Sequence, residues 1–157
     1  MGYAANIDTA YLQYQVGREI YKWDSVYQEA LFQAKSGTWA IGTNANDYLY
    51  NYVGNSSPAI GDICDFGAFV VPVTGTYTFY AIGTTANNQA IWNIYINGSN
   101  VATIDWYSAG EVRNVAKSVT LGSLTQGVKC LEIRTATKNG SSSNYGCQLQ
   151  AMAIVRA

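Results

Sequence analysis

The chain has 157 residues, of which 48% are hydrophobic and only 12% are charged. Disordered proteins show the opposite balance, so the composition predicts a folded chain that is long enough to bury one sizeable core. The net charge is −1 and the few Lys and Arg residues are scattered, so nucleic acid is excluded as a partner. No apolar run approaches the roughly 18 residues of a membrane-spanning helix, and we expect no membrane partner either.

The first 40 residues carry an amphipathic pattern that differs from the rest of the chain. Apolar side chains recur there at intervals of three and four residues, which keeps them on one face of a helix. Residues 11–16 also alternate as a strand would, so an extended arm is the alternative. We therefore expect residues 1–40 to form an N-terminal helix or arm for assembly, and residues 41–157 to form a separate domain. The expected apolar face consists of Leu12, Val16, Ile20, Trp23, Tyr27 and Leu31.

The segment from residue 43 to residue 61 is rich in Asn, Gly, Ser and Tyr. Turn-forming residues dominate it, which predicts a loop, with a short strand at residues 48–50. Tyr48, Tyr50 and Tyr52 alternate, so on a strand they would share one face. That face would either serve as a platform for a ligand or pack beneath the domain.

From Phe66 onward the chain shows the pattern of antiparallel β-structure. Asn97-Gly98 directly follows an alternating run and is the strongest short signal for a β-hairpin, because both residues tolerate positive φ. Short alternating runs separated by turns predict a jelly-roll β-sandwich, and the fold class is therefore all-β. The expected strands are residues 66–73, 77–82, 91–96, 101–106, 112–121, 128–134 and 147–155.

Residues for catalysis or metal binding are scarce. The sequence contains no histidine, the commonest general acid–base residue, so we expect no enzyme activity, no catalytic residue and no cofactor. Calcium is the one metal considered, at Asp62 and Asp65, with turn capping as the alternative role. Cys64, Cys130 and Cys147 are odd in number and widely spaced, which favours free thiols.

Several short motifs follow one another from Gly61 onward. They are Gly61-Asp62 and residues 66–73, 75–80, 94–98, 105–109 and 138–145. In this order they resemble the jelly-roll modules of bacteriophage virion proteins, namely capsid decoration, head-fibre and tail-fibre proteins, over residues 61–155. The resemblance implies a homotrimer on the virion surface, made in the host cytoplasm, that attaches to other virion proteins through its N-terminal segment. The absence of a signal peptide in the printed sequence agrees with that localisation.

A second resemblance is carried by fewer residues. A Gly-x-Tyr-x-Phe run at residues 75–79, a strand ending in Asn97-Gly98 and a last strand after a Gly- and Asn-rich loop are similar to jelly-roll carbohydrate-binding modules. This resemblance implies a glycan as partner, bound by stacking on exposed aromatic rings. For Trp106 the alternative is an anchor in the core or in an interface. The candidate stacking residues are Tyr48, Tyr50, Tyr52, Trp106, Tyr107 and Tyr145.

Overall fold

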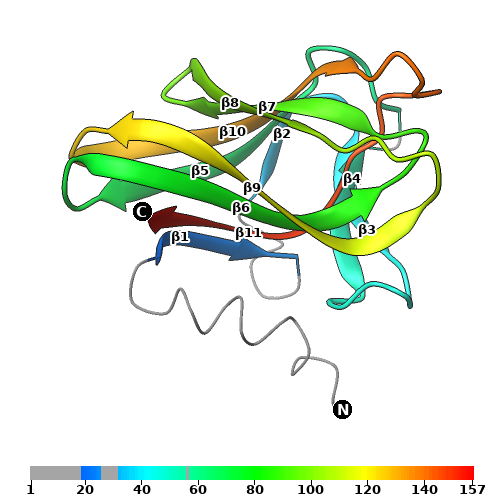
Figure 1. Ribbon diagram of the computed structural model, residues 1–157, viewed down its shortest axis with the longest axis horizontal. Helices are drawn as coiled ribbons and strands as arrows, with labels where there is room; N and C mark the ends of the chain where they lie inside the picture. The colour runs from blue at the N-terminus through cyan, green and yellow to red at the C-terminus, as the bar shows by residue number, and fades with distance from the viewer. Residues whose placement is uncertain (1–18, 26–31, 56) are drawn as a thin grey trace.

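The computed structural model describes residues 19–25, 32–55 and 57–157. These residues form two antiparallel sheets that pack face to face as a sandwich (Figure 1). The strands are β1 (Glu19–Asp24), β2 (Gln33–Ser36), β3 (Trp39–Thr43), β4 (Asn51–Asn55), β5 (Ile63–Val71), β6 (Gly75–Thr85), β7 (Ala90–Ile96), β8 (Ser99–Asp105), β9 (Val112–Leu124), β10 (Gly127–Lys138) and β11 (Gln148–Arg156). The predicted jelly-roll β-sandwich is confirmed.

Two strand orders define the sandwich. The first sheet runs β3-β4-β11-β6-β9, and β1 also pairs with β11. The second sheet runs β2-β5-β10-β7-β8. None of the described residues forms a helix of the length and hydropathy that a bilayer crossing requires.

The core forms because alternate residues of the long strands turn inward. On β7 the buried residues are Ala90, Trp92, Ile94 and Ile96, and the last three agree with their predicted spacing. Facing them from β6 are Tyr77 and Phe79, which are fully buried. Both inner faces therefore contribute large side chains to one continuous core.

The tight turn at Asn97-Gly98 joins β7 to β8. The φ angles of Asn97 and Gly98 are 50° and 77°, the positive values that a type I′ turn requires. The hairpin predicted from this dipeptide is confirmed, and β7 and β8 pair antiparallel on either side of it.

The N-terminal segment differs from the expectation where the structure describes it. Ile20 and Trp23 lie on strand β1, which pairs antiparallel with β11, so the helix interpretation is wrong for these two residues. Trp23 is fully buried because alternation turns it toward the core. Strand β2 pairs with β5, and the expected domain boundary at residue 40 falls inside β3. The sandwich therefore begins before residue 40.

The other residues of the expected assembly face lie outside the described residues, and their docking role stays a prediction. They are Leu12, Val16, Tyr27 and Leu31.

The segment predicted as a loop, residues 43–61, begins at the last residue of β3 and contains the whole of β4. β3 and β4 pair antiparallel, from Trp39 opposite Asn55 to Thr43 opposite Asn51. The strand expected at residues 48–50 is wrong, because these residues form the turn between β3 and β4. Tyr50 has a φ of 62°, which is incompatible with an extended strand.

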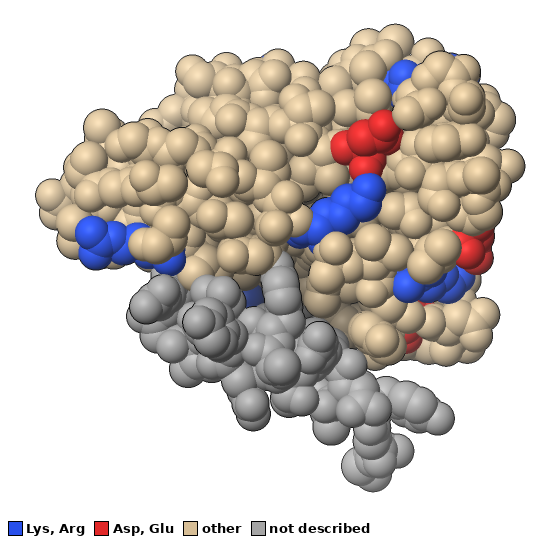
Figure 2. All heavy atoms as spheres, viewed as in Figure 1, with Lys and Arg blue, Asp and Glu red and all other residues tan. Residues whose placement is uncertain are grey.

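Charged side chains are sparse on the face of the molecule that Figure 2 shows. One group of ion pairs fastens the edge strand β2 to its sheet. Lys35 Nζ lies 2.7 Å from Asp65 Oδ2 and 2.6 Å from Glu132 Oε1. Arg134 Nη2 lies 2.5 Å from Glu132 Oε2. These pairs join β2, β5 and β10 across the sheet.

Candidate ligand-binding site

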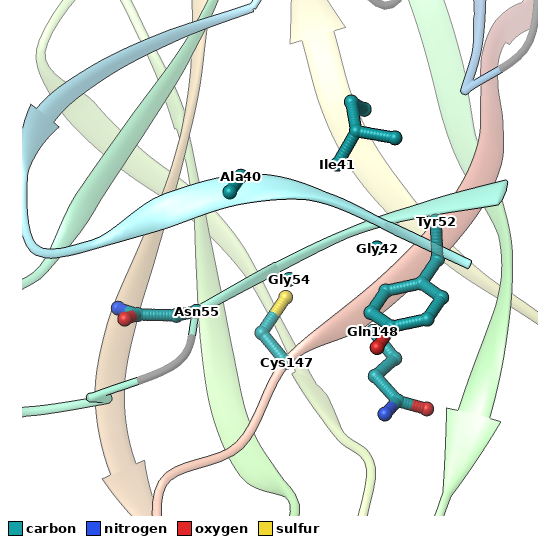
Figure 3. Close-up of a pocket in the computed structure, with 8 residues that line it drawn as sticks. All are labelled: Ala40, Ile41, Gly42, Tyr52, Gly54, Asn55, Cys147 and Gln148. Carbon is teal, nitrogen blue, oxygen red and sulfur yellow. The ribbon is translucent and has the colours of Figure 1, made fainter. Parts of the chain in front are cut away.

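A pocket of about 220 Å³ lies where β3 and β4 meet the first residues of β11 (Figure 3). Strand pairing explains its composition. Gly54 lies opposite Ala40 on one side and Gln148 on the other, and paired residues point to the same face of a sheet. Val53 and Leu149, their neighbours in sequence, are fully buried in the core. The pocket is lined by Ala40, Ile41, Gly42, Tyr52, Gly54, Asn55, Cys147 and Gln148.

The ring of Tyr52 lies across two glycines and forms a wall of this pocket (Figure 3). A methyl group at Gly42 would lie 2.5 Å from Tyr52 Cζ, and one at Gly54 would lie 2.8 Å from Tyr52 Cε2. Neither distance is compatible with a real side chain, so the ring occupies this position only because both residues are glycine.

The polar groups of the pocket differ in their availability. Asn55 Nδ2 donates to Asp62 Oδ2 at 2.6 Å, and Asn55 Oδ1 accepts from Thr38 Oγ1 at 2.9 Å. Both ends of this amide are therefore already used. Gln148 Oε1 is buried and accepts no hydrogen bond from any residue that the structure describes. A ligand cannot reach an atom that has no exposed surface, so the end of this amide that is open to a ligand is its NH₂ group, which is not among the buried unpaired atoms and donates to no residue that the structure describes.

Comparison with known proteins defines the fold and not a family. No family model and no curated protein matches the chain. Over 88% of its length the chain is similar to the carbohydrate-binding module CBM6cm-2 of Cellvibrio mixtus lichenase 5A, in complex with cellotriose, with a TM-score of 0.62, 14% identity and 98% of that module covered. A family 35 carbohydrate-binding module from Clostridium thermocellum is similar over 87% of this chain and 98% of that one, with a TM-score of 0.59 and 16% identity.

The chain shares its fold with carbohydrate-binding modules. A xanthan lyase from Paenibacillus matches 89% of the chain with a TM-score of 0.64 and 25% identity, but the chain spans only 13% of that enzyme. None of these three structures is a virion protein. They therefore support the second of the two sequence resemblances, and the virion resemblance gains no support from them.

Of the predicted stacking residues, Tyr52 is the one that lines the pocket. Tyr48 and Tyr50 lie on the turn that leads into β4 and are 42% and 56% exposed. The three tyrosines therefore do not share a strand face, although they remain close in sequence at one end of β4.

The turn that carries Tyr48 and Tyr50 is fastened to strand β9. Arg113 Nη1 lies 3.1 Å from Asp47 Oδ1, and the side chain of Asp47 is fully buried. The backbone N–H of Tyr48 donates to Asn114 Oδ1 at 2.7 Å. These contacts tie the turn that carries Tyr48 and Tyr50 to strand β9.

Trp106 is not a stacking platform. It is fully buried, and its ring centroid lies 4.6 Å from that of Trp92. Stacking with a ligand is wrong for this residue, and the alternative of a core anchor is confirmed. Trp106 lies two residues after the buried Ile104 at the end of β8, so alternation turns both side chains toward the core.

Tyr107 and Tyr145 are half-buried in loops and lie outside the lining of the pocket. The backbone N–H of Tyr107 donates to Asp105 Oδ1 at 2.8 Å. Lys138 Nζ lies 5.1 Å from the ring centroid of Tyr145. Neither ring therefore lines the pocket together with Tyr52.

The proposed calcium residues are occupied by other contacts. Asp62 Oδ2 accepts from the backbone N–H of Ala59 at 2.8 Å as well as from Asn55. Asp65 Oδ1 accepts from the backbone N–H of Gly67 at 2.7 Å. Within the described ranges no cluster of three metal-ligating side chains occurs. The alternative of turn capping therefore describes the contacts of both residues, and calcium binding stays a prediction.

Sequence reasoning missed Gly42, Gly54 and Gln148. They come from three strands, and only pairing brings them together. The available signal was weak: a glycine inside a strand often marks the close approach of another group.

Proposed function

We propose that this chain is a non-catalytic carbohydrate-binding module and that its ligand binds in the pocket beside Tyr52. The observation that carries the proposal is the ring of Tyr52 lying across Gly42 and Gly54. Because Gly42 and Gly54 have no side chains, the ring of Tyr52 can lie across both of them. A binding site needs an aromatic ring that is held in one position in this way.

The chemistry of the pocket suits a saccharide. A sugar ring has an apolar C–H face and a rim of hydroxyl groups. An aromatic wall supplies the apolar contact, and its amphipathic ring tolerates water at one end. A free amide supplies hydrogen bonds to hydroxyl groups, and small-molecule sites combine these two features. The fold shared with the cellotriose-bound Cellvibrio module supports the same ligand class.

The composition of the site supports a binding role rather than a catalytic one. The lining contains neither Asp nor Glu, so it lacks the paired carboxylates of a glycosidase. The whole sequence lacks histidine, which removes the commonest acid–base group. Binding is what the remaining groups can do.

The test is calorimetric titration with soluble oligosaccharides, beginning with cellotriose. We expect Tyr52→Ala to weaken binding at least about tenfold, which corresponds to ~1.4 kcal/mol. Tyr52→Phe keeps the ring and should retain most of the affinity. Tyr145→Ala removes an aromatic side chain outside the pocket and serves as the matched control. Unchanged binding by Tyr52→Ala would remove the basis of the proposal.

The virion interpretation stays a prediction that the sequence resemblance alone supports. It is compatible with glycan binding, because a fibre tip can bind a glycan. Its specific consequence is a homotrimer, with a solution mass near three times 17.0 kDa. Light scattering after size exclusion measures that mass, and a monomer would weaken the virion interpretation without touching the binding proposal.

A further inference from the structure

Among the residues that the structure describes, none with a charged side chain lines the pocket. The eight lining residues are two aliphatic residues, two glycines, one tyrosine, one cysteine and two amide residues. One carboxylate lies just behind them, since Asp62 Oδ2 accepts from the lining residue Asn55 at 2.6 Å. Asp62 is itself buried. The described lining therefore offers no positive group to a ligand, and a carboxylate lies behind one side of it.

This charge distribution discriminates between classes of sugar. A uronic acid carries a carboxylate, which loses hydration on entering a pocket. Burial of a charge is costly unless an opposite charge or several hydrogen bonds compensate for it. The pocket supplies no opposite charge, and the carboxylate of Asp62 adds repulsion. Neither the desolvation of a charge nor the repulsion from Asp62 applies to an uncharged sugar.

Hydrogen-bonding capacity points to a single residue. An amide side chain has an oxygen that accepts and an NH₂ group that donates. The amide of Asn55 is committed to Asp62 and Thr38. The buried Oε1 of Gln148 has no donor among the residues that the structure describes. The NH₂ group of Gln148 is not among the buried unpaired atoms, so Gln148 is the amide that can donate to a hydroxyl group of the ligand.

The size of the pocket limits how much of the ligand it holds. A volume of about 220 Å³ is below the ~300–1,000 Å³ of pockets that enclose drug-sized molecules. The pocket therefore has room for about one sugar ring, with the rest of an oligosaccharide outside it.

From these observations, and resting on the proposed function, we infer that the pocket binds one uncharged sugar ring and that Gln148 is the residue that determines this specificity. Tyr52 contacts any sugar through its ring face, whereas Gln148 recognises the hydroxyl rim. The two residues therefore have separable effects on affinity.

The experiment compares cellotriose, mannotriose and xylotriose with trigalacturonic acid by calorimetry on the full chain. We expect at least one neutral trisaccharide to bind at least tenfold more tightly than trigalacturonic acid. Gln148→Met, which keeps the side-chain length without the amide, should weaken neutral binding about 2- to 12-fold. Gln126→Met is the matched control, because Gln126 is exposed in the β9–β10 turn, and it should leave binding unchanged.

The outcomes separate the inference from the proposed function. Equal or tighter binding of trigalacturonic acid, lost in Tyr52→Ala, overturns the neutral-sugar inference and keeps the binding module. Unchanged neutral binding by a folded Gln148→Met overturns the role of Gln148. No binding of any of the four probes overturns both. If Gln148→Met does not fold, the role of Gln148 is tested by NMR on the unmodified protein. Its side-chain NH₂ resonances should shift when the neutral trisaccharide binds, and unchanged resonances would overturn its role.

Discussion

The indole ring of Trp23 meets the ring of Phe66 edge-on, with 5.0 Å between centroids and 74° between planes. Trp23 lies on β1 of one sheet and Phe66 on β5 of the other. The hydroxyl group of Tyr21 also donates to the backbone oxygen of Phe66 at 2.8 Å. Strand β1 therefore helps to close the sandwich, and this part of the N-terminal segment belongs to the core.

Trp23→Ala should lower the free energy of unfolding by about 3–5 kcal/mol, the usual cost of removing a large buried aromatic side chain. Lys22→Ala is the control, because Lys22 is exposed on the same strand, and its effect should stay within about 0.5 kcal/mol. Urea unfolding followed by fluorescence measures both. Equal effects of the two variants would contradict the place of β1 in the core.

Gly42→Ala should leave the fold intact and weaken ligand binding. The new methyl group would lie 2.5 Å from Tyr52 Cζ, so the ring has to move while the backbone stays. Gly110→Ala is the control, because a methyl group there has no atom within 4 Å. Titration with the trisaccharide that binds the unmodified protein best should show a loss of about tenfold or more for Gly42→Ala alone. Equal affinity of the two variants would show that the position of the ring is unimportant.

Acid should weaken the sandwich through Glu132. Burial opposes the charged form of Glu132, but hydrogen bonds from Lys35 and Arg134 outweigh it and hold the pKa of Glu132 below its ordinary value. A lowered pKa in the folded state gives stability that is present above the ordinary value, about 4.3, and is lost as pH falls through the folded-state pKa. Glu132→Gln should reduce the fall in unfolding midpoint between about pH 5 and pH 3. An identical pH dependence in both proteins would contradict the ion-pair assignment.

The three cysteines should differ in reactivity. Burial, with a smaller contribution from Asp65, raises the pKa of the Cys64 thiol, and burial also raises that of Cys147. Cys130 is exposed, and thiolate character with access determines reactivity. A thiol reagent should therefore modify one cysteine of the native protein quickly and all three after unfolding, with Cys130→Ser abolishing the fast reaction. Fast modification of either remaining thiol in the native Cys130→Ser protein would contradict this burial.

Much of the fold follows from local sequence patterns because those patterns act over short distances. Alternation marks the inward residues of β7, and Asn97-Gly98 marks its turn. The helix prediction failed at Ile20 and Trp23. The two residues are three positions apart, which fits a helix but also fits a strand with a register shift. Such a shift occurs between Glu19 and Tyr21, and the pairing of β1 with β11 decides in favour of the strand.

The site was less accessible to sequence reasoning. Tyr52 was predicted as a candidate because it belongs to a group of tyrosines. Trp106 was a second candidate, with a core or interface anchor as the alternative, and its packing against Trp92 decides for the core. Gln148 had no local signal at all. Its availability depends on Asn55 being bound to Asp62 and on the pairing of β11 with β4, which are long-range contacts.

The central claim is that the pocket beside Tyr52 binds a sugar, and the most direct measurement is an ¹⁵N NMR titration of the full chain with cellotriose, mannotriose and xylotriose. The account predicts that one of these trisaccharides shifts the side-chain amide of Gln148 and the backbone amides of Gly42 and Gly54. Shifts confined to the loops that carry Tyr107 and Tyr145, or no shifts with any of the three, would contradict it.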